Sequence, residues 1–156
     1  MTKVNSLTIE DVGKMLVDVT QSMFDERFLP DDKRSDLPNL GGMAFYGRIL
    51  TLAADNKIDL VCLCSAHCGV QLTGKILHCS EAEVEADVIG DAIGELVNVV
   101  AGQVKSFLGT SHVIGLPRDF NPASEKEDAK NLPWQGRLYH SPAGTIHLWL
   151  GIRMTE

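Results

Sequence analysis

The sequence predicts a single α+β domain with a largely antiparallel sheet, two long helices and one short helix. The 156-residue chain is long enough for one compact domain with a substantial core and too short for two. Helical and strand-like patterns follow one another in the order helix, strands, two helices, strands, with turns between neighbouring strands. That order is typical of an α+β domain.

The first helix is predicted over about residues 9–26. Thr8 and Asp11 have the three-residue spacing of a capping box, in which two side chains satisfy backbone N–H groups at the helix start. The apolar residues that follow fall on one helical face: Val12, Met15, Leu16, Val19 and Met23. Residues 29–42 contain two prolines, two glycines and a charged run, so we expect a surface loop there.

Two strands are predicted at residues 43–53 and 57–65, joined by the turn dipeptide Asp55-Asn56. A short helix is expected at residues 66–78. Ser80 and Glu83 repeat the capping-box spacing, and we expect them to begin the longest helix, residues 81–108, which Gly109 would end.

The last part of the chain is predicted to be mostly strands. A short strand at residues 112–116 ends at Pro117, and residues 118–133 form a polar loop pattern. Two final strands, at residues 134–140 and 145–154, flank a turn that contains Pro142 and Gly144. No linker or low-complexity segment divides the chain.

The charge balance argues against two classes of partner. The chain carries 14 Lys and Arg against 21 Asp and Glu, a formal net charge of −7. Binding to a phosphate backbone or to an anionic membrane surface therefore loses its main driving force. The first ten residues lack the apolar core of a secretory signal, and no apolar stretch is long enough to span a membrane. We therefore expect a cytoplasmic protein.

The longest predicted helix carries a narrow polar stripe on an otherwise apolar surface. On a helical wheel the stripe consists of Asp87, Asp91, Glu95, Asn98 and Lys105. Small residues flank it, namely Gly90, Gly94, Ala101 and Gly102. Each glycine inside a helix costs about 1 kcal/mol relative to alanine. Two interpretations stay open: the glycines lower the walls beside the stripe for another protein, or they admit a neighbouring helix of the same domain.

The segment DAIGELVNVVAG, residues 91–102, resembles the signature helix of the CheC/CheX/FliY chemotaxis phosphatase family. The motif Glu-x-x-Asn is present as Glu95 and Asn98. Lys105 continues the resemblance, whereas Gln103 stands where the family commonly has asparagine. The resemblance covers about residues 8–154, with its specificity in residues 91–105, and implies one CheC-like domain over residues 1–156.

The number of motifs points to one branch of this family. CheC-like members carry two copies of the motif on two long helices, and CheX-like members carry one. Glu95 and Asn98 form the only Glu-x-x-Asn of this chain, and Asp18 with Gln21 in the first helix is interpreted as a structural pair. The chain therefore resembles CheX-like members, which implies a homodimer formed through a sheet edge.

The resemblance implies a phosphatase that acts on the phospho-aspartate of a CheY-like receiver domain. Asn98 would orient the attacking water, and Glu95 would pair with the receiver's active-site lysine. Magnesium would come from the receiver, so no cofactor or metal of this chain is expected. Residues at the rim of the partner-binding surface would be Asp91, Gly94, Gly102 and Lys105.

Two other hypotheses remain at this point. Cys62, Cys64 and Cys68, with His67 beside them, suggest a metal or redox site, although buried free cysteines are common on strands. The second hypothesis is a non-enzymatic module of the same fold that binds a receiver or serves as an adaptor, as flagellar-switch components do. The presence of both Glu95 and Asn98 favours the phosphatase.

Overall fold

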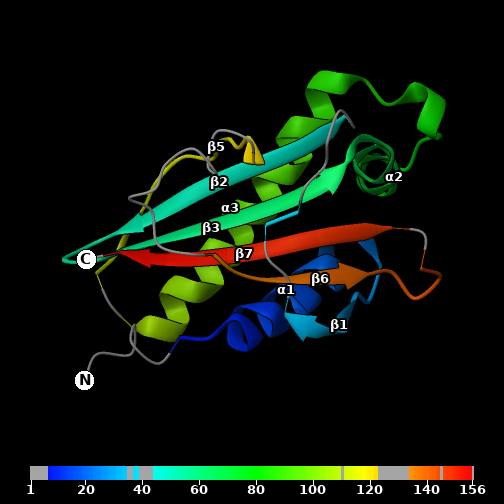
Figure 1. Cartoon of the computed structure of the whole chain (residues 1–156). Coiled ribbons are helices and arrows are strands. Elements are labelled where there is room, and N and C mark those ends of the chain that lie inside the picture. The colour runs from blue at the N-terminus through cyan, green and yellow to red at the C-terminus, as the bar shows by residue number, and fades with distance from the viewer. Residues whose placement is uncertain are drawn as a thin grey trace.

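The computed structural model describes residues 7–34, 37–38, 44–109, 111–122, 134–144 and 146–155. Within these ranges three α-helices pack on one face of a seven-stranded sheet (Figure 1). The helices are α1 (Ile9–Phe24), α2 (Ala66–Leu77) and α3 (Ala86–Leu108), with a short 3₁₀ turn at Glu81–Glu83. The strands are β1 (Leu29–Arg34), β2 (Phe45–Ala53), β3 (Lys57–Ser65), β4 (Val113–Ile114), β5 (Arg118–Asp119), β6 (Gln135–His140) and β7 (His147–Thr155).

The sheet has the order β1-β6-β7-β3-β2-β4, and β5 also pairs with β2. All of these pairs are antiparallel. The predicted α+β class, with its largely antiparallel sheet, two long helices and one short helix, is therefore confirmed.

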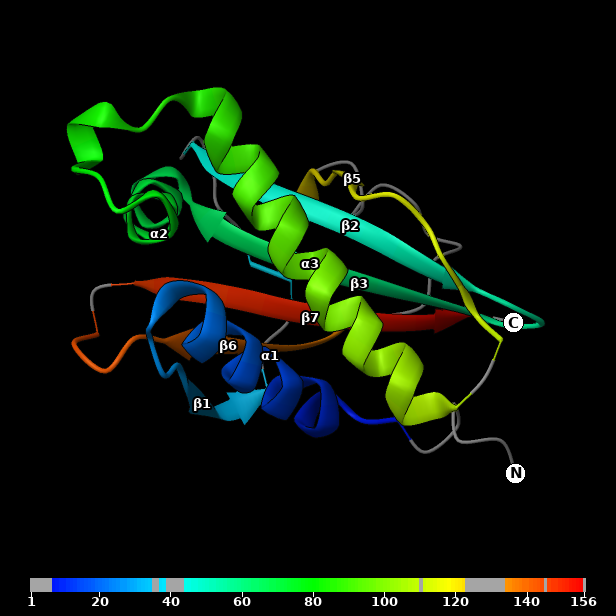
Figure 2. The ribbon, with the colours of Figure 1, turned by 180° about the vertical axis from the view of Figure 1, so that it is seen from behind.

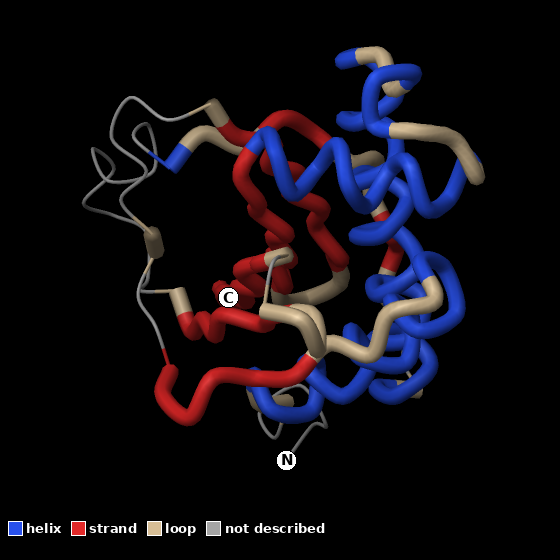
Figure 3. The backbone as a smooth tube through the Cα atoms, turned by 90° about the vertical axis from the view of Figure 1, so that its right-hand side faces the viewer, coloured by secondary structure: helices blue, strands red, loops and turns tan. Residues whose placement is uncertain are grey.

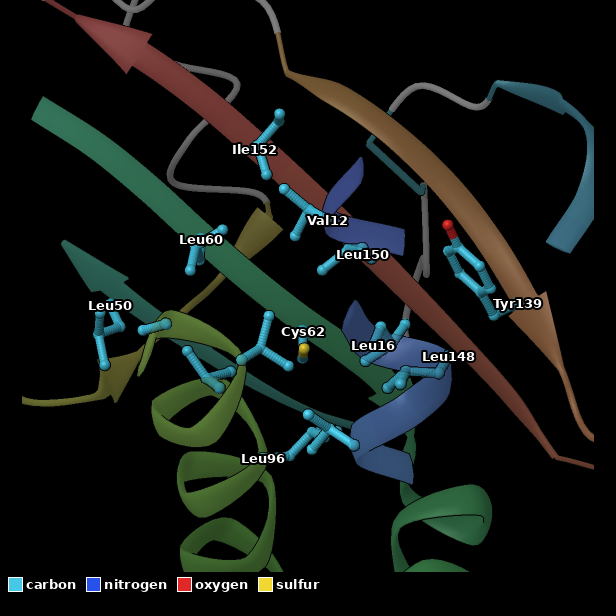
Figure 4. Packing of buried hydrophobic residues seen from close by; sticks show 14 of the residues in the cluster. Val12, Leu16, Leu50, Leu60, Cys62, Leu96, Tyr139, Leu148, Leu150 and Ile152 are labelled. Atoms are coloured by element: carbon cyan, nitrogen blue, oxygen red, sulfur yellow. The ribbon is translucent and has the colours of Figure 1, made fainter. Parts of the chain in front are cut away.

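Alternating side chains divide the strand residues between the two faces of the sheet. On β3, Leu60 and Cys62 belong to the main core beneath the helices, whereas Val61 and Leu63 lie in a smaller cluster on the opposite face. The helices lie mainly to one side of the strands (Figure 3). Figure 4 shows residues of α1, α3 and the strands that meet in the main core. This burial on both faces explains why β3 is nearly continuously apolar in sequence.

Helix α3 crosses the helical face of the sheet, packs on β2 and β3 and contacts both other helices (Figure 2). Its buried residues line one side of the helix: Ile89, Gly90, Ile93, Gly94, Leu96, Val97, Val100, Ala101, Val104 and Leu108. The helix ends at Gly109, which adopts the left-handed conformation with φ 61°. Because the apolar side of α3 packs into the core, the polar stripe on its other side faces the solvent.

Two predicted loop regions contain short edge segments of the sheet. Leu29–Arg34 forms β1 beside β6, and Arg118–Asp119 forms β5 beside β2. Edge strands need hydrogen bonds on one side only, so they tolerate proline and charged residues that look like loop composition in a sequence. The remainder of the loop predicted at residues 29–42 lies outside the described residues except Leu37 and Pro38, as do residues 123–133.

The two capping-box patterns have different outcomes. At α1 the Thr8 hydroxyl accepts a bond from the Asp11 N–H and the Asp11 carboxylate accepts one from the Thr8 N–H, each 3.1 Å long, so this prediction is confirmed. At Ser80 and Glu83 the capping-box prediction is wrong. The Ser80 hydroxyl donates to the Glu83 carboxylate instead, and α3 begins only at Ala86. A 3₁₀ turn intervenes, so the backbone N–H groups that Ser80 would cap are not those of α3.

These capping residues give a matched stability test. Thr8→Ala removes a cap and is expected to lower the free energy of unfolding by about 1 kcal/mol. Ser80→Ala removes an exposed side-chain bond and is expected to change it by less than about 0.5 kcal/mol. Urea unfolding followed by circular dichroism measures both. Equal losses in the two variants would show that Ser80 also caps a helix.

Candidate functional site

Three residues of the polar stripe meet at one groove. Asp91, Glu95 and Asn98 are exposed on α3 and line a groove of about 500 Å³. We call it the site groove, and its full lining is Arg48, Gly90, Asp91, Gly94, Glu95, Asn98, Leu116, Pro117 and Asp119. The structure therefore brings together the predicted residues Asp91, Gly94, Glu95 and Asn98, whereas Gly102 and Lys105 lie outside the lining of this groove.

The wall opposite α3 comes from residues that the sequence patterns did not single out as functional. Arg48 lies on β2, and Asp119 lies on β5, paired with it in the sheet register. The guanidinium of Arg48 forms an ion pair with Asp119, and its Nε donates to the Gly90 carbonyl over 3.2 Å. Leu116, between β4 and β5, is 83% exposed at the rim. The packing of α3 on β2 places this wall opposite the helix, across the 42 positions that separate Arg48 from Gly90.

Glu95 and Asn98 lie one helical turn apart, so their side chains are neighbours on the helix surface. Both are exposed, and neither side chain forms a hydrogen bond or ion pair with another described residue. A carboxylate and an amide are thus presented together without a side-chain partner in the part of the chain that the structure describes. The amide can both donate and accept hydrogen bonds and does not titrate.

The three glycines beside the stripe differ in what surrounds them. A Cβ at Gly90 would collide with the Arg48 guanidinium, so this glycine admits a side chain of the same domain. A Cβ at Gly94 would meet Pro117 at 3.5 Å, an ordinary contact, and one at Gly102 would meet nothing within 4 Å. Close packing within the domain thus accounts for Gly90 but not for Gly94 or Gly102. The interpretation that the glycines admit a neighbouring helix is wrong for the described structure, since Gly90 admits a strand side chain.

The cysteine cluster lies in the core rather than at a surface. Cys62, Cys64 and Cys68 are buried, and no group of three or more His, Cys, Asp or Glu residues in the described ranges could hold a metal ion. Burial raises the pKa of the Cys62 thiol, and burial together with the neighbouring Cys68 raises that of Cys64 to about 12. A raised pKa keeps a thiol protonated and weakly nucleophilic at neutral pH.

Comparisons with known proteins identify the fold. Neither a protein-family model nor a curated protein sequence matches the chain significantly. Among solved structures, a CheC-like superfamily protein from a Shewanella species is similar with a TM-score of 0.68 at 19% identity, over 95% of this chain and 97% of that one. The CheX–CheY–BeF₃–Mg²⁺ complex from Borrelia burgdorferi is similar with a TM-score of 0.67 at 15% identity, over 96% of this chain and 99% of that one.

The FliM middle domain from Vibrio alginolyticus is also similar, with a TM-score of 0.59 at 9% identity, over 96% of this chain and 94% of that one. The chain therefore has the fold of the CheC/CheX chemotaxis proteins, a fold shared with a FliM domain. This is the fold that the signature helix led us to expect. In the described part of the chain, no helix combines the length and apolarity that crossing a membrane requires.

The surroundings of two glycines lead to opposite stability predictions. Gly102→Ala is expected to raise the free energy of unfolding by about 0.5–1 kcal/mol, because the new methyl group enters open space and alanine favours the helix. Gly13→Ala on α1 is the matched control. Its methyl group would collide with the ring hydroxyl of buried Tyr139, and a loss of about 1–3 kcal/mol is expected. Chemical denaturation measures both, and a loss at Gly102 would contradict the open surroundings.

Thiol labelling tests the placement of the cysteines. In the native protein at pH 8 we expect a thiol reagent to modify Cys79, the half-buried one, well before Cys62 and Cys64. Mass spectrometry of labelled peptides identifies the sites, and unfolded protein, in which all four thiols should react, is the control. Rapid native labelling of Cys62 or Cys64 would show an accessible redox site.

Proposed function

We propose that this protein is a phosphatase that hydrolyses the phospho-aspartate of a CheY-like receiver domain. The observation that carries the proposal is the placement of Glu95 and Asn98. They lie side by side on the exposed stripe of α3, at a groove, in a CheC/CheX-like fold. The presence of both residues favours the phosphatase over a module that only binds the receiver.

The reaction depends more on the position of the attacking water than on acid–base catalysis. An acyl phosphate is already labile, so a water held in line with the phosphorus supplies most of the acceleration. The water attacks phosphorus, the bond between phosphorus and the aspartyl oxygen breaks, and aspartate and inorganic phosphate result. Asn98 orients the water through its amide. The receiver provides the magnesium ion, and this chain provides none.

Glu95 fixes the register of the two proteins. Its carboxylate pairs with the receiver's active-site lysine, a charge-assisted bond that also sets the distance from Asn98 to the phosphoryl group. The open surroundings of Gly102 support this arrangement, because no side chain stands above the helix one turn beyond Asn98, and Gly94 keeps the helix surface beside Glu95 free of a side chain of its own. Asp91 contributes to the rim of the groove, and Lys105 and Gly102 extend the docking surface along the helix.

The CheX–CheY complex supports the class of partner, since a structure of the same fold has been solved with CheY. By the family resemblance we also propose that the protein acts in the cytoplasm as a homodimer joined through a sheet edge. A second candidate function, a non-enzymatic receiver-binding or adaptor module, is favoured by one observation, the similarity to the FliM middle domain.

Substitution at the two motif residues tests the phosphatase. Asn98→Ala is expected to slow dephosphorylation at saturating receiver about 100-fold, because the water is no longer positioned. Glu95→Ala is expected to raise the half-saturating receiver concentration about tenfold or more, because a charge-assisted contact is lost. The assay measures phosphate release from receivers of the same organism, phosphorylated with acetyl phosphate.

Gln103→Ala is the matched control, since it removes an exposed amide from the same helix outside the site groove. It should behave like the native protein. Binding of a receiver without any acceleration by the native protein would favour the adaptor module. Full activity of the Glu95→Ala, Asn98→Ala double variant would contradict the assigned site.

A further inference from the structure

Arg48 is a cation set into a groove that otherwise presents carboxylates. The ionisable residues lining the site groove are Asp91, Glu95, Asp119 and Arg48. Glu95 and Asp91 already belong to the proposed docking stripe, whereas Arg48 has no role in the chemistry described above. The contacts of Arg48 with its neighbours keep its guanidinium at the groove.

The position of Arg48 in the sheet is an unusual one for a charged residue. In the cross-strand register Arg48 lies beside Cys62, which lies beside Leu150, and all three point to the helical face. Cys62 and Leu150 are 1% and 0% exposed. Arg48 escapes the core only at its tip, because its side chain is 23% exposed where β2 meets the groove. The guanidinium therefore reaches the groove along a mostly buried stem.

The helix opposite makes room for this side chain. A Cβ at position 90 would collide with a terminal guanidinium nitrogen, so any other residue there would displace the guanidinium from this position, and Nε donates to the Gly90 carbonyl over 3.2 Å. An interior glycine costs a helix about 1 kcal/mol. A Cβ placed on Gly94 would lie 3.9 Å from Arg48 Nε, and Asn98 follows Gly94 by four residues, or about 6 Å along the helix axis. The cation is thus held about one helical turn from the proposed water-positioning residue.

The ion pair with Asp119 leaves the guanidinium available to a partner. Asp119 is 91% exposed, so its carboxylate is well hydrated and the pair is easily exchanged. An arginine guanidinium carries five N–H donors. One of them donates to the Gly90 carbonyl, and the terminal N–H groups can donate to a new acceptor in place of Asp119. Asp119 thus occupies the position that an incoming anionic oxygen would take.

We infer that Arg48 is a partner-binding residue that receives an anionic oxygen of the receiver, either of the phosphoryl group or of a surface carboxylate. The inference rests on the proposed function. A net charge of −7 and the carboxylates of the groove oppose the approach of an acidic partner site, and a cation in the same groove as Asn98 counters this repulsion. On docking, the partner's oxygen replaces Asp119 on the guanidinium.

The test compares receiver binding by three variants. Arg48→Gln removes the cation, Asp119→Asn removes its internal partner, and Arg118→Gln is the matched control. Arg118 lies next to Asp119 in the sequence, is exposed and carries the same positive charge as Arg48. It donates a hydrogen bond to the Thr51 hydroxyl and does not line the groove. Calorimetry measures the dissociation constant for a receiver activated with beryllium fluoride and Mg²⁺ and for the same receiver unactivated. Thermal unfolding confirms that each variant is folded.

We expect Arg48→Gln to weaken binding about tenfold or more, Arg118→Gln to change it by less than about threefold, and Asp119→Asn to bind at least as tightly as the native protein. A loss confined to the activated receiver would assign the anion to the phosphoryl group, and an equal loss in both states would assign it to carboxylates.

Two results would overturn the inference. One is an affinity of folded Arg48→Gln within about twofold of the native protein. The other is an equal loss in Arg48→Gln and Asp119→Asn, which would make their ion pair an internal brace between β2 and β5. If the native protein neither binds nor dephosphorylates any receiver, the proposed function fails and the inference fails with it. If the native protein is active and Arg48→Gln is equally active, the proposed function stands and only the inference about Arg48 fails.

Discussion

The burial of one side of α3 against the sheet is the constraint on which the candidate site depends. Ile93, Leu96, Val97 and Val100 are at most 1% exposed, and each buried aliphatic side chain contributes about 1.5–3 kcal/mol. Glu95 and Asn98 lie within two residues of these core positions. Rotating the helix by one residue would bury a carboxylate and expose aliphatic side chains. The core therefore fixes the direction in which the site residues point.

The same helix shows how small residues can have different purposes in one stretch of sequence. Gly90 makes room for Arg48, a side chain of the sheet, whereas a Cβ added at Gly102 would meet nothing within 4 Å. The first is explained by packing within the domain, and the second leaves a surface open to another molecule. Both carry the same cost in helix stability, so only their neighbours distinguish a packing glycine from one that keeps a docking surface low.

Charge is the main difficulty for the proposed action on an acidic partner. The surplus of negative charge is partly concentrated where the proposed partner docks, because Asp91 and Glu95 lie on the stripe and Asp119 lies on the opposite wall. Specific contacts then have to outweigh the general repulsion. The proposed contacts do so in pairs of opposite sign, Glu95 with a lysine and Arg48 with an anionic oxygen, and such a pattern specifies one orientation.

The sequence by itself determined the fold class, the long helices and the polar stripe, because a helix period of 3.6 and a sheet period of 2 leave direct traces in a chain. Within that stripe, the resemblance to the CheC/CheX/FliY signature helix singled out Glu95 and Asn98, on which the proposed function rests. The capping box of Thr8 was readable for the same reason, since its bonds are local. Only the tertiary structure decided what lies opposite the stripe. Arg48 and Asp119 are 71 positions apart and come together through strand pairing, which depends on register rather than on local pattern. Likewise, β1 has the composition of a loop and becomes a strand only because β6 supplies its partner.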